Sequence, residues 1–181
     1  MSIKSNQNIE VEVRSFISKS QYQNLLDFFK KNGKFLGDDY QITYYFSGKN
    51  DLRIQKNNNF AKLWLKSGKI HDNAREEIEV KFNRNDFDKL EKLLLALGYK
   101  VEIKWFRKRN KFQWKNIKVT VDFTKGYAYI IELEKLSTAK NKDKVYQNLL
   151  NQFSSLKIEL TPKKEFEKKF NYYKNNWEKL I

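Results

Sequence analysis

Three short segments of the chain carry carboxylates at alternate positions, and these are the residues best suited to chemistry. The segments are residues 9–14, 75–81 and 129–134, with the acidic pairs Glu10 and Glu12, Glu77 and Glu79, and Glu132 and Glu134. In a β-strand, alternate side chains point to the same face, so each segment would present one charged face. Carboxylate oxygens held close together are hard ligands of the kind that suit Mg²⁺ or Mn²⁺.

Basic side chains concentrate on other segments that alternate in the same way. The shared faces are Arg53 and Gln55 in residues 51–56, Lys62, Trp64 and Lys66 in residues 61–66, and Trp105, Arg107, Arg109 and Lys111 in residues 101–114. Arginine and lysine suit phosphate oxygens, and one arginine can bind two of them. A site that combines these bases with the carboxylates would bind a metal–polyphosphate complex, as phosphoryl transfer requires.

The pattern of apolar residues predicts eight strands and four helices. The predicted strands cover residues 9–14, 41–46, 51–56, 61–66, 75–82, 101–114, 117–123 and a segment that ends at Glu134. The predicted helices run from Ser18 or Ser20 to Asn32, over residues 86–97, over residues 142–153, and onward from Thr161 and Pro162. Serine and threonine suit helix caps, and proline suits the first helical position.

The strands and helices must cover one another's apolar surfaces. Helices packed outside a curved sheet would bury the apolar strand faces, and closure of the sheet would remove its exposed edges. The predicted fold is therefore α+β, a closed eight-stranded antiparallel β-barrel, or tunnel, with helices packed outside, in a single domain over residues 1–181. The charged strand faces would line the inside of this tunnel; the alternative is an ordinary solvated face.

The composition fits one folded domain and restricts its chemistry. The 181 residues are 40% hydrophobic and include no cysteine, which excludes disulfides, thiolate metal sites and cysteine nucleophiles. The sequence shows neither a signal peptide nor an apolar run long enough to span a bilayer, so we expect a cytoplasmic location and no membrane partner. The net charge of +15 favours a polyanionic partner and leaves nucleic acid open.

Residue counts argue against two common kinds of active site. The only histidine is His71, in a predicted loop, so a histidine-based metal site cannot form. The six glycines form neither a G-x-G-x-x-G nor a Walker pattern, which argues against a Rossmann or P-loop nucleotide site.

Several motifs, taken in order, resemble the CYTH domain, also called the triphosphate tunnel metalloenzyme superfamily, which includes class IV adenylyl cyclases and thiamine triphosphatases. The opening Glu10-x-Glu12-x-Arg14 resembles the family's E-x-E-x-K signature, and Glu132-Leu133-Glu134 resembles its closing E-I-E. Two further segments resemble strands of the family: Leu52-Arg53-Ile54-Gln55 resembles L-R-I-R, and Leu63-Trp64-Leu65-Lys66 resembles the strand that ends in the phosphate-binding lysine. Arg75-x-Glu77-x-Glu79 resembles the family's R-x-E-x-E motif. Arg107-x-Arg109-x-x-Phe112 resembles its K-x-R-x-x-Y motif. The chain departs from the family at Arg14, where lysine is usual, and at Gln55, which replaces an arginine.

The resemblance implies a role for each matching residue. The implied ligands of Mg²⁺ or Mn²⁺ are Glu10, Glu12, Asp122, Glu132 and Glu134. The implied triphosphate-binding residues are Arg14, Arg53, Lys66, Arg107 and Arg109. The residues expected to take part in catalysis are Glu10, Glu12, Lys66 and Arg107, and those expected to support the metals or orient water are Glu77, Glu79 and Arg75.

The predicted function is that of a Mg²⁺- or Mn²⁺-dependent triphosphatase, which cleaves the terminal phosphate of tripolyphosphate, a nucleoside triphosphate or thiamine triphosphate. One alternative is a class IV adenylyl cyclase, in which the ribose 3′-hydroxyl of ATP attacks the α-phosphorus and cyclic AMP forms. A second alternative is a non-catalytic module that binds RNA or polyphosphate, with salt-sensitive binding that needs no Mg²⁺. The expected partner of the enzyme is a small-molecule triphosphate, and the expected state is a monomer or a homodimer.

Overall fold

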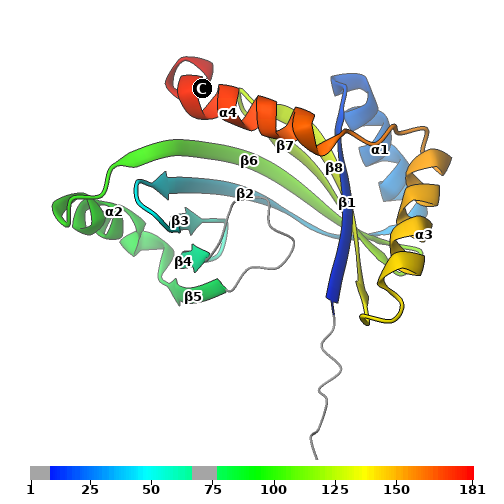
Figure 1. The fold of residues 1–181 in the computed structure, drawn as a ribbon, viewed down its shortest axis with the longest axis horizontal. Coiled ribbons are helices and arrows are strands. Elements are labelled where there is room, and N and C mark those ends of the chain that lie inside the picture. The colour runs from blue at the N-terminus through cyan, green and yellow to red at the C-terminus, as the bar shows by residue number, and fades with distance from the viewer. Residues whose placement is uncertain (1–8, 67–76) are drawn as a thin grey trace, which may run out of the picture. The chain divides into compact units, whose positions relative to one another are not determined.

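Within the part of the chain that the structure describes, eight strands and four α-helices follow one another as shown in Figure 1. This computed structural model describes residues 9–66 and 77–181, without the side chains of Lys66 and Glu77. The strands are β1 (Ile9–Ile17), β2 (Lys34–Phe46), β3 (Asp51–Lys56), β4 (Ala61–Lys66), β5 (Glu77–Phe82), β6 (Val101–Trp114), β7 (Ile117–Thr124) and β8 (Ala128–Ser137). The helices are α1 (Lys19–Asn32), the short 3₁₀ helix η1 (Arg84–Asp86), α2 (Phe87–Ala96), α3 (Lys142–Ser155) and α4 (Lys163–Leu180). None of these helices combines the length and the apolar content that crossing a membrane requires.

The eight strands belong to one sheet, in which hydrogen-bonded neighbours follow the order β1-β8-β7-β6-β2-β3-β4-β5. The β1–β8, β2–β3, β3–β4 and β4–β5 pairs are antiparallel. These features confirm the predicted α+β fold built on an eight-stranded antiparallel sheet. The order ends at β1 and β5, and the described residues of these two strands do not pair with each other. Among the residues that the structure describes, backbone hydrogen bonds therefore do not close the sheet into the barrel that the sequence predicts.

The predicted elements agree closely with the observed ones, and the main difference is the start of β2. The sequence predicts a strand from Gln41, whereas β2 begins at Lys34. Four of the first five residues of β2 are exposed, so they lack the alternation of buried and exposed side chains on which the prediction depends. The strand predicted from Arg75 is observed from Glu77, and residues 75 and 76 lie outside the described part.

The chain forms two compact units, and each is described by itself. Unit 1 comprises the described part of Met1–Asp38 together with Arg109–Phe123 and Ala128–Lys169. Unit 2 comprises the described part of Asp39–Lys108 together with Thr124–Tyr127 and Phe170–Ile181. The elements β2, β6 and α4 therefore contribute residues to both units.

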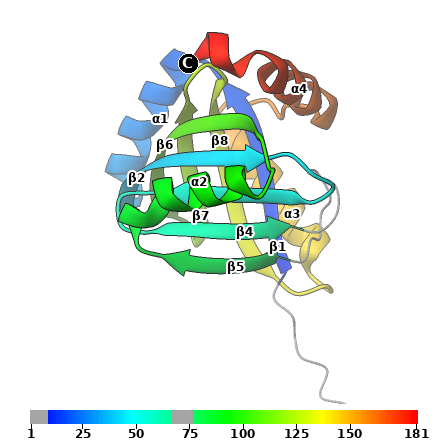
Figure 2. The same cartoon turned by 90° about the vertical axis from the view of Figure 1, so that its left-hand side faces the viewer.

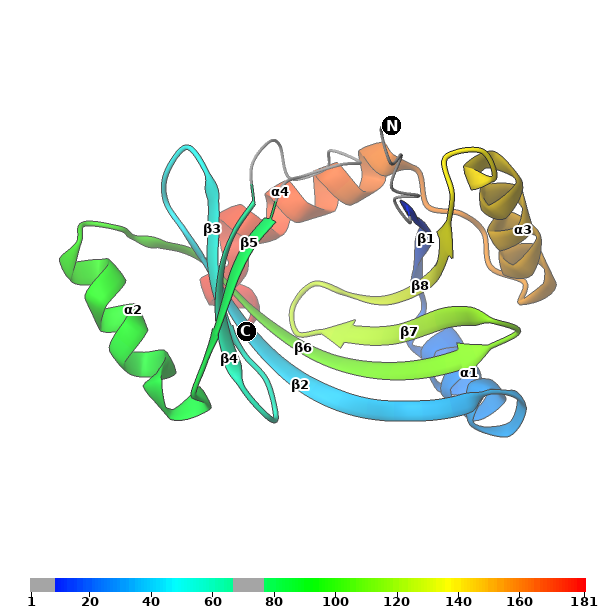
Figure 3. The same ribbon diagram turned by 90° about the horizontal axis from the view of Figure 1, so that it is seen from below.

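The core of unit 1 lies between helices α1 and α3 and the apolar face of the strands, which are seen together in Figure 3. Its fully buried members include Phe29 of α1, Val119 of β7, Ile131 and Leu133 of β8, and Leu149 of α3. Burying each such side chain contributes about 1.5–3 kcal/mol. The two helices thus cover the apolar strand face, as predicted, and the alternating charged residues of β1 and β8 point to the other face.

Local signals set both ends of α1. The Ser18 hydroxyl accepts a hydrogen bond from the Gln21 backbone N–H at 3.1 Å, and the Gln21 side chain accepts one from the Ser18 N–H at 2.8 Å. This capping box satisfies two N–H groups near the start of the helix. At the other end, the N–H of Gly33 donates to the carbonyl of Phe29. Of the two predicted caps, Ser18 is therefore the one that the structure uses.

In unit 2, α2 packs against β3 and its neighbours, as Figure 2 shows. Its Phe87 and Leu94 form a buried cluster with Ile54 of β3. The spacing of apolar residues in the sequence predicts that Phe87, Leu90, Leu93, Leu94 and Leu97 form one buried stripe, but Leu93 and Leu97 are 55% and 67% exposed. Leu97 follows Ala96, the last residue of α2, so it is the C-cap of the helix.

The second half of α4 covers the opposite face of unit 2. Tyr173 packs with Trp105 of β6, and its hydroxyl donates a hydrogen bond to the Lys104 carbonyl at 2.8 Å. Tyr45 joins this cluster, whereas its neighbour Phe46 lies in the cluster beneath α2. Because adjacent strand residues point to opposite faces, the two clusters lie on opposite sides of β2.

Candidate functional site

Two carboxylates, Glu12 and Glu134, lie directly opposite each other on neighbouring strands of unit 1. They are register partners in the β1–β8 pair, and the next pair on the same face joins Arg14 to Glu132. Direct cross-strand partners have Cβ atoms about 4.5–5.5 Å apart. Glu10 continues the same face of β1, and buried apolar residues alternate with these positions. The charged residues of β1 and β8 therefore share one face, opposite the helix-covered core.

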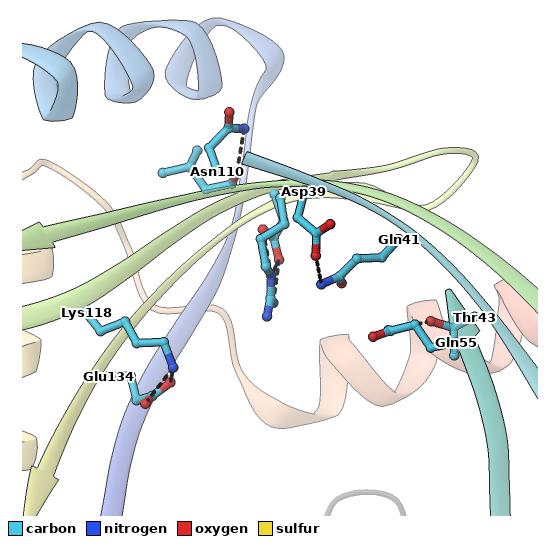
Figure 4. Close-up of polar contacts among 10 residues, drawn as sticks. Asp39, Gln41, Thr43, Gln55, Asn110, Lys118 and Glu134 are labelled. Carbon is cyan, nitrogen blue, oxygen red and sulfur yellow. Dashed lines mark hydrogen bonds and ion pairs between the residues drawn. The ribbon is translucent and has the colours of Figure 1, made fainter. Parts of the chain in front are cut away.

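A lysine of β7 pairs with Glu134 on this face. The ammonium of Lys118 lies 2.8 and 3.0 Å from the two carboxylate oxygens of Glu134, as Figure 4 shows. The side chain of Lys118 is 48% exposed, and that of Glu134 is 14% exposed. Glu134 is therefore bordered by a like charge, Glu12, on one side and by an opposite charge on the other.

A second ion pair joins Arg109 of β6 to Asp122 of β7. The Nε atom of Arg109 lies 3.1 and 3.0 Å from the two oxygens of Asp122, and Nη2 lies 2.7 Å from one of them. Burial disfavours the arginine's charge, but Asp122, Glu132 and Glu134 outweigh it and raise the pKa of Arg109 above its ordinary value. Only 4% of the Asp122 side chain is exposed. Arg109 thus remains charged and compensates carboxylates on two strands.

Thr120 lies on β7 between these two ion pairs. It alternates with Lys118 and Asp122, so the three side chains share one face of the strand. Thr120 is 2% exposed, and its hydroxyl oxygen has no hydrogen-bond partner among the described residues. A buried hydroxyl without a partner costs about 1–3 kcal/mol. Within the described part of the chain, the hydroxyl of Thr120 is therefore an unsatisfied polar group on the charged face of β7.

The first half of α4 borders the same face of β1. The rings of Phe16 and Phe166 have centroids 4.1 Å apart. The Arg14 guanidinium lies 4.8 Å from the Phe166 ring centroid, and the Lys169 ammonium lies 4.7 Å from that of Phe16. Because Arg14 and Phe16 alternate on β1, α4 adds a positive charge at the end of the charged face.

In unit 2, Tyr45, Arg53 and Trp64 form a row across three neighbouring strands. Tyr45 is the register partner of Arg53, which in turn is the partner of Trp64. The Arg53 guanidinium lies 4.2 Å from the Tyr45 ring centroid and 5.6 Å from that of Trp64. Asp51 accepts two hydrogen bonds from Arg53, 2.6 Å from Nε and 2.5 Å from Nη2. Two rings and one carboxylate therefore hold this planar cation in place.

Two other predicted residues of unit 2 also contact neighbouring side chains. The Arg107 guanidinium lies 5.6 Å from the Trp105 ring centroid. The Glu79 carboxylate lies 2.7 Å from the Lys62 ammonium, whose hydrogen bond is the main cause that lowers the pKa of Glu79. Glu79 is therefore stabilised in its charged form by a lysine of the adjacent strand.

Uncharged and acidic side chains of β2 and β3 pair with each other in unit 2. Gln55 donates a hydrogen bond to the Thr43 hydroxyl at 2.8 Å, and Gln41 donates to Asp39 at 2.9 Å, as drawn in Figure 4. At Gln55 the CYTH motif has an arginine. The neutral contact with Thr43 therefore stands where that motif would add a positive charge.

The carboxylates of unit 1 fit a divalent cation by residue type and by register. Glu12 and Glu134 are opposed oxygen donors on adjacent strands, and Glu10 and Glu132 flank them on the same face. Among the described residues, however, no three or more histidine, cysteine, aspartate or glutamate side chains are grouped so that they could hold a metal ion. Glu134 and Asp122 are instead paired with protein cations. Metal binding at this face would therefore require a change in side-chain positions.

The predicted site residues divide between the two units. Unit 1 contains Glu10, Glu12, Arg14, Arg109, Asp122, Glu132 and Glu134, and unit 2 contains Arg53, Lys66, Glu77, Glu79 and Arg107. The side chains of Lys66 and Glu77 and the whole of Arg75 lie outside the described part of the chain. In unit 1 the predicted carboxylates of β1 and β8 come together on one face; that all these residues line one tunnel stays a prediction.

Sequence reasoning assigned no role to Lys118, Thr120 or Asp51, although each follows the same spacing rule. Lys118 and Thr120 alternate with Asp122 in the predicted strand 117–123. Asp51 precedes Arg53 by two residues and so shares its strand face. Extending the alternation beyond the family motifs would have found all three.

Comparison with known proteins identifies the family to which this fold and these charged faces belong. A family model of the CYTH domain matches residues 8–165. The chain therefore belongs to the CYTH domain family. A candidate adenylate cyclase of Methanocaldococcus jannaschii, MJ0240, is 31% identical over 163 residues, which cover 83% of this chain and 90% of that protein.

Solved structures share the fold. A conserved hypothetical protein from Pyrococcus furiosus matches with a TM-score of 0.65 and 23% identity, over 83% of this chain and 91% of that chain. HpAC1 from Hippeastrum, a candidate adenylyl cyclase described as having a dominant triphosphatase activity, matches with a TM-score of 0.62 and 18% identity, over 84% and 89% of the two chains. At these identities the likeness shows the fold alone, and it agrees with the expected α+β fold built on an eight-stranded antiparallel sheet.

Proposed function

We propose that this protein is a divalent-metal-dependent triphosphatase that releases the terminal phosphate of a triphosphate. The observation that carries the proposal is the opposed pair Glu12 and Glu134, with Arg14 in register with Glu132 on the same face and the charge of Arg109 stabilised by Glu132 and Glu134. Hard oxygen ligands beside guanidinium groups suit a metal–triphosphate complex. Two relatives, one named as a candidate adenylate cyclase and one described by a triphosphatase activity, support a triphosphate as the substrate class.

The residues of unit 1 take distinct roles in this proposal. The carboxylates that would hold Mg²⁺ or Mn²⁺ are Glu10, Glu12, Glu132 and Glu134, with Asp122 next to them. A bound divalent cation would stabilise the negative charge on the phosphate oxygens during transfer. Arg14, whose guanidinium packs on the Phe166 ring, binds phosphate oxygens at the end of the charged face. Arg109 keeps Asp122 and its neighbouring carboxylates compensated, and Thr120 offers its buried hydroxyl to the bound phosphate or to the attacking water.

For unit 2 we carry over the roles that the family motifs imply. Arg53, Lys66 and Arg107 bind phosphate groups, and Glu77, Glu79 and Arg75 support the site. The guanidinium of Arg53 is held in place by Asp51 and by two aromatic rings. Fixing a cation before the substrate arrives reduces the reorganisation needed to stabilise transferred charge.

The test is a turnover screen of the full chain with tripolyphosphate, thiamine triphosphate and ATP. We expect orthophosphate release with Mg²⁺ or Mn²⁺ from at least one of them, and no release with EDTA. The variant Glu12→Gln should turn over about two orders of magnitude more slowly, whereas Asp27→Asn, which changes an exposed carboxylate on α1, should match the unaltered protein. Metal-independent turnover, or no turnover of any of the three compounds, would contradict the proposal.

A class IV adenylyl cyclase is the second candidate, because the relative that is 31% identical bears a cyclase name. The same cations and carboxylates would then position the α-phosphorus of ATP for attack by the ribose 3′-hydroxyl, with pyrophosphate leaving. Cyclic AMP and pyrophosphate as products of ATP would favour the cyclase. Orthophosphate without cyclic AMP would favour hydrolysis.

A non-catalytic role in binding RNA or polyphosphate predicts, in contrast, that the protein needs no divalent metal ion to bind its ligand. Binding would weaken steeply with salt and would need no Mg²⁺. Substituting Glu10 or Glu134 by glutamine would leave it unchanged or strengthen it, because each change removes a negative charge. Loss of metal-dependent turnover in the same variants would argue against this role.

A further inference from the structure

We propose that Lys118 is a built-in counter-ion that competes with the divalent cation for Glu134 and so weakens metal binding at the charged face of unit 1. The inference rests on the proposed function, because it takes Glu134 as a metal ligand. Lys118 lies outside the CYTH motifs found in this chain. The inference assigns it an effect on the affinity of the protein for the metal ion.

The geometry of the pair makes the two cations alternatives. Lys118 Nζ lies 3.0 Å from one carboxylate oxygen of Glu134 and 2.8 Å from the other. A metal ion bound to Glu134 would have to use oxygens that the ammonium now contacts. Two cations on the same carboxylate would repel each other, so binding of a metal ion to Glu134 favours displacement of the lysine.

The charges on this face explain why a cation is held there. Glu12 and Glu134 are direct cross-strand partners, and like charges in that position destabilise a sheet. Lys118 offsets the repulsion with one positive charge, and a divalent cation would offset it with two. When one cation is bound, less repulsion between the carboxylates remains for the other to offset. The lysine and the metal ion therefore compete.

Because Lys118 is partly exposed, displacing its ammonium from Glu134 costs little free energy. Nearly half of its side chain, 48%, is exposed, so the ammonium can move into water without losing hydration. Exposed ion pairs are weak, and competition from this one should change metal affinity by about fivefold. Lys118 would therefore adjust the metal affinity without abolishing binding.

Thr120 gives independent evidence that an external group completes this face. Its side chain is on the same face of β7 as Lys118, two residues away. The hydroxyl is buried and has no partner among the described residues. A bound phosphate, or a water on a bound cation, would supply the missing hydrogen bond next to the position that Lys118 occupies.

The experiment measures Mn²⁺ binding to the full chain without substrate, by calorimetry and by the electron paramagnetic resonance signal of free Mn²⁺. We expect Lys118→Gln to bind Mn²⁺ about fivefold more tightly than the unaltered protein. Lys118→Arg keeps the charge and should bind no more tightly. The matched control is Lys135→Gln, next to Glu134 in the chain but in register with the buried Val11 and so on the opposite face. It should change the affinity by less than about twofold.

A double variant checks that the effect acts through Glu134. In a Glu134→Gln background, Lys118→Gln should produce no gain in Mn²⁺ affinity, because the contested carboxylate is gone. An equal gain in that background, an equal gain in Lys135→Gln, or no gain in Lys118→Gln would each overturn the inference. The turnover screen answers a separate question: metal-dependent turnover with unchanged Mn²⁺ affinity in Lys118→Gln rejects the counter-ion and keeps the proposed function. Absence of turnover rejects the function itself.

Discussion

Glu12 of β1 and Glu134 of β8 face each other as direct register partners, with Arg14 and Glu132 as the next pair on the same face. Two carboxylates in this position repel each other, which works against sheet stability. The same arrangement gives two oxygen donors that a cation can bridge. The repulsion between Glu12 and Glu134 thus lowers the stability of the sheet at the place where we propose that metal binds.

The first prediction separates stability from function at this pair. Glu12→Gln should lower metal-dependent turnover by about two orders of magnitude, because a charged ligand is lost. In EDTA the same variant should melt at a higher temperature than the unaltered protein, because the repulsion is removed. Turnover assays and thermal melts measure the two effects. A variant that is both less stable in EDTA and less active would indicate that Glu12 acts structurally.

The second prediction concerns the buried ion pair between Arg109 and Asp122. Arg109→Met should reduce the free energy of unfolding by about 3–5 kcal/mol, because it removes the ion pair that offsets the charge of Asp122, whose side chain is only 4% exposed. Adding Asp122→Asn should recover much of that loss. Urea denaturation measures both variants. Lys111→Met, on the same strand, should change the value by less than about 0.5 kcal/mol. If the double variant is no more stable than Arg109→Met, the loss comes from packing and not from charge.

The third prediction tests whether the orphaned hydroxyl of Thr120 serves a ligand. Thr120→Val keeps the shape and removes a buried hydroxyl that has no partner in the described chain, so stability should stay the same or rise by about 1 kcal/mol. If the hydroxyl binds phosphate or water during the reaction, turnover should fall about tenfold even so. Unchanged turnover in a more stable variant would show that the hydroxyl has no ligand.

The sequence was sufficient for the element order and for the charged face of unit 1, because both depend on strand alternation. The positions of Glu10, Glu12, Glu132 and Glu134 on a face opposite the core follow from a period of two. The early part of β2 could not be found this way, since four of its first five residues are exposed and show no alternation. Periodicity also overstated the buried stripe of α2, because it cannot give the width of the surface that a helix covers.

The sequence motifs did not predict which charged side chains form ion pairs with each other. The resemblance assigned Asp122 to a metal and Arg109 to a triphosphate, yet in the structure these two residues bind each other. Likewise, Glu134 contacts Lys118 of the adjacent strand. Such pairs depend on the register of neighbouring strands, which the sequence of a single strand does not contain.

The fourth prediction concerns the shape of the cation at position 53. Arg53→Lys keeps the charge but loses the two-point contact with Asp51 and the planar contact with the Tyr45 ring. It should reduce the free energy of unfolding by about 1–3 kcal/mol and raise the KM for triphosphate nearly as much as Arg53→Met does. Lys56→Gln, on the same strand, loses an ion pair with an exposed Asp88 and should cost less than about 1 kcal/mol. Full function in Arg53→Lys would mean that charge alone is sufficient there.

The fifth prediction uses the alkaline titration of Tyr173 in unit 2. Burial, with a smaller contribution from Tyr45, raises the pKa of this hydroxyl to about 12, and the group donates to the Lys104 carbonyl. The unfolded value is about 10, so the folded state holds the proton more tightly. The associated stability is fully present below about pH 10 and is lost as the pH rises towards 12. Tyr173→Phe has no proton to lose, so its free energy of unfolding should fall less steeply over this range than that of the unaltered protein. Urea denaturation at a series of pH values measures the difference, with the 61% exposed Tyr172 changed to phenylalanine as the control. A constant difference between Tyr173→Phe and the unaltered protein across this range would show that Tyr173 titrates at its ordinary pKa.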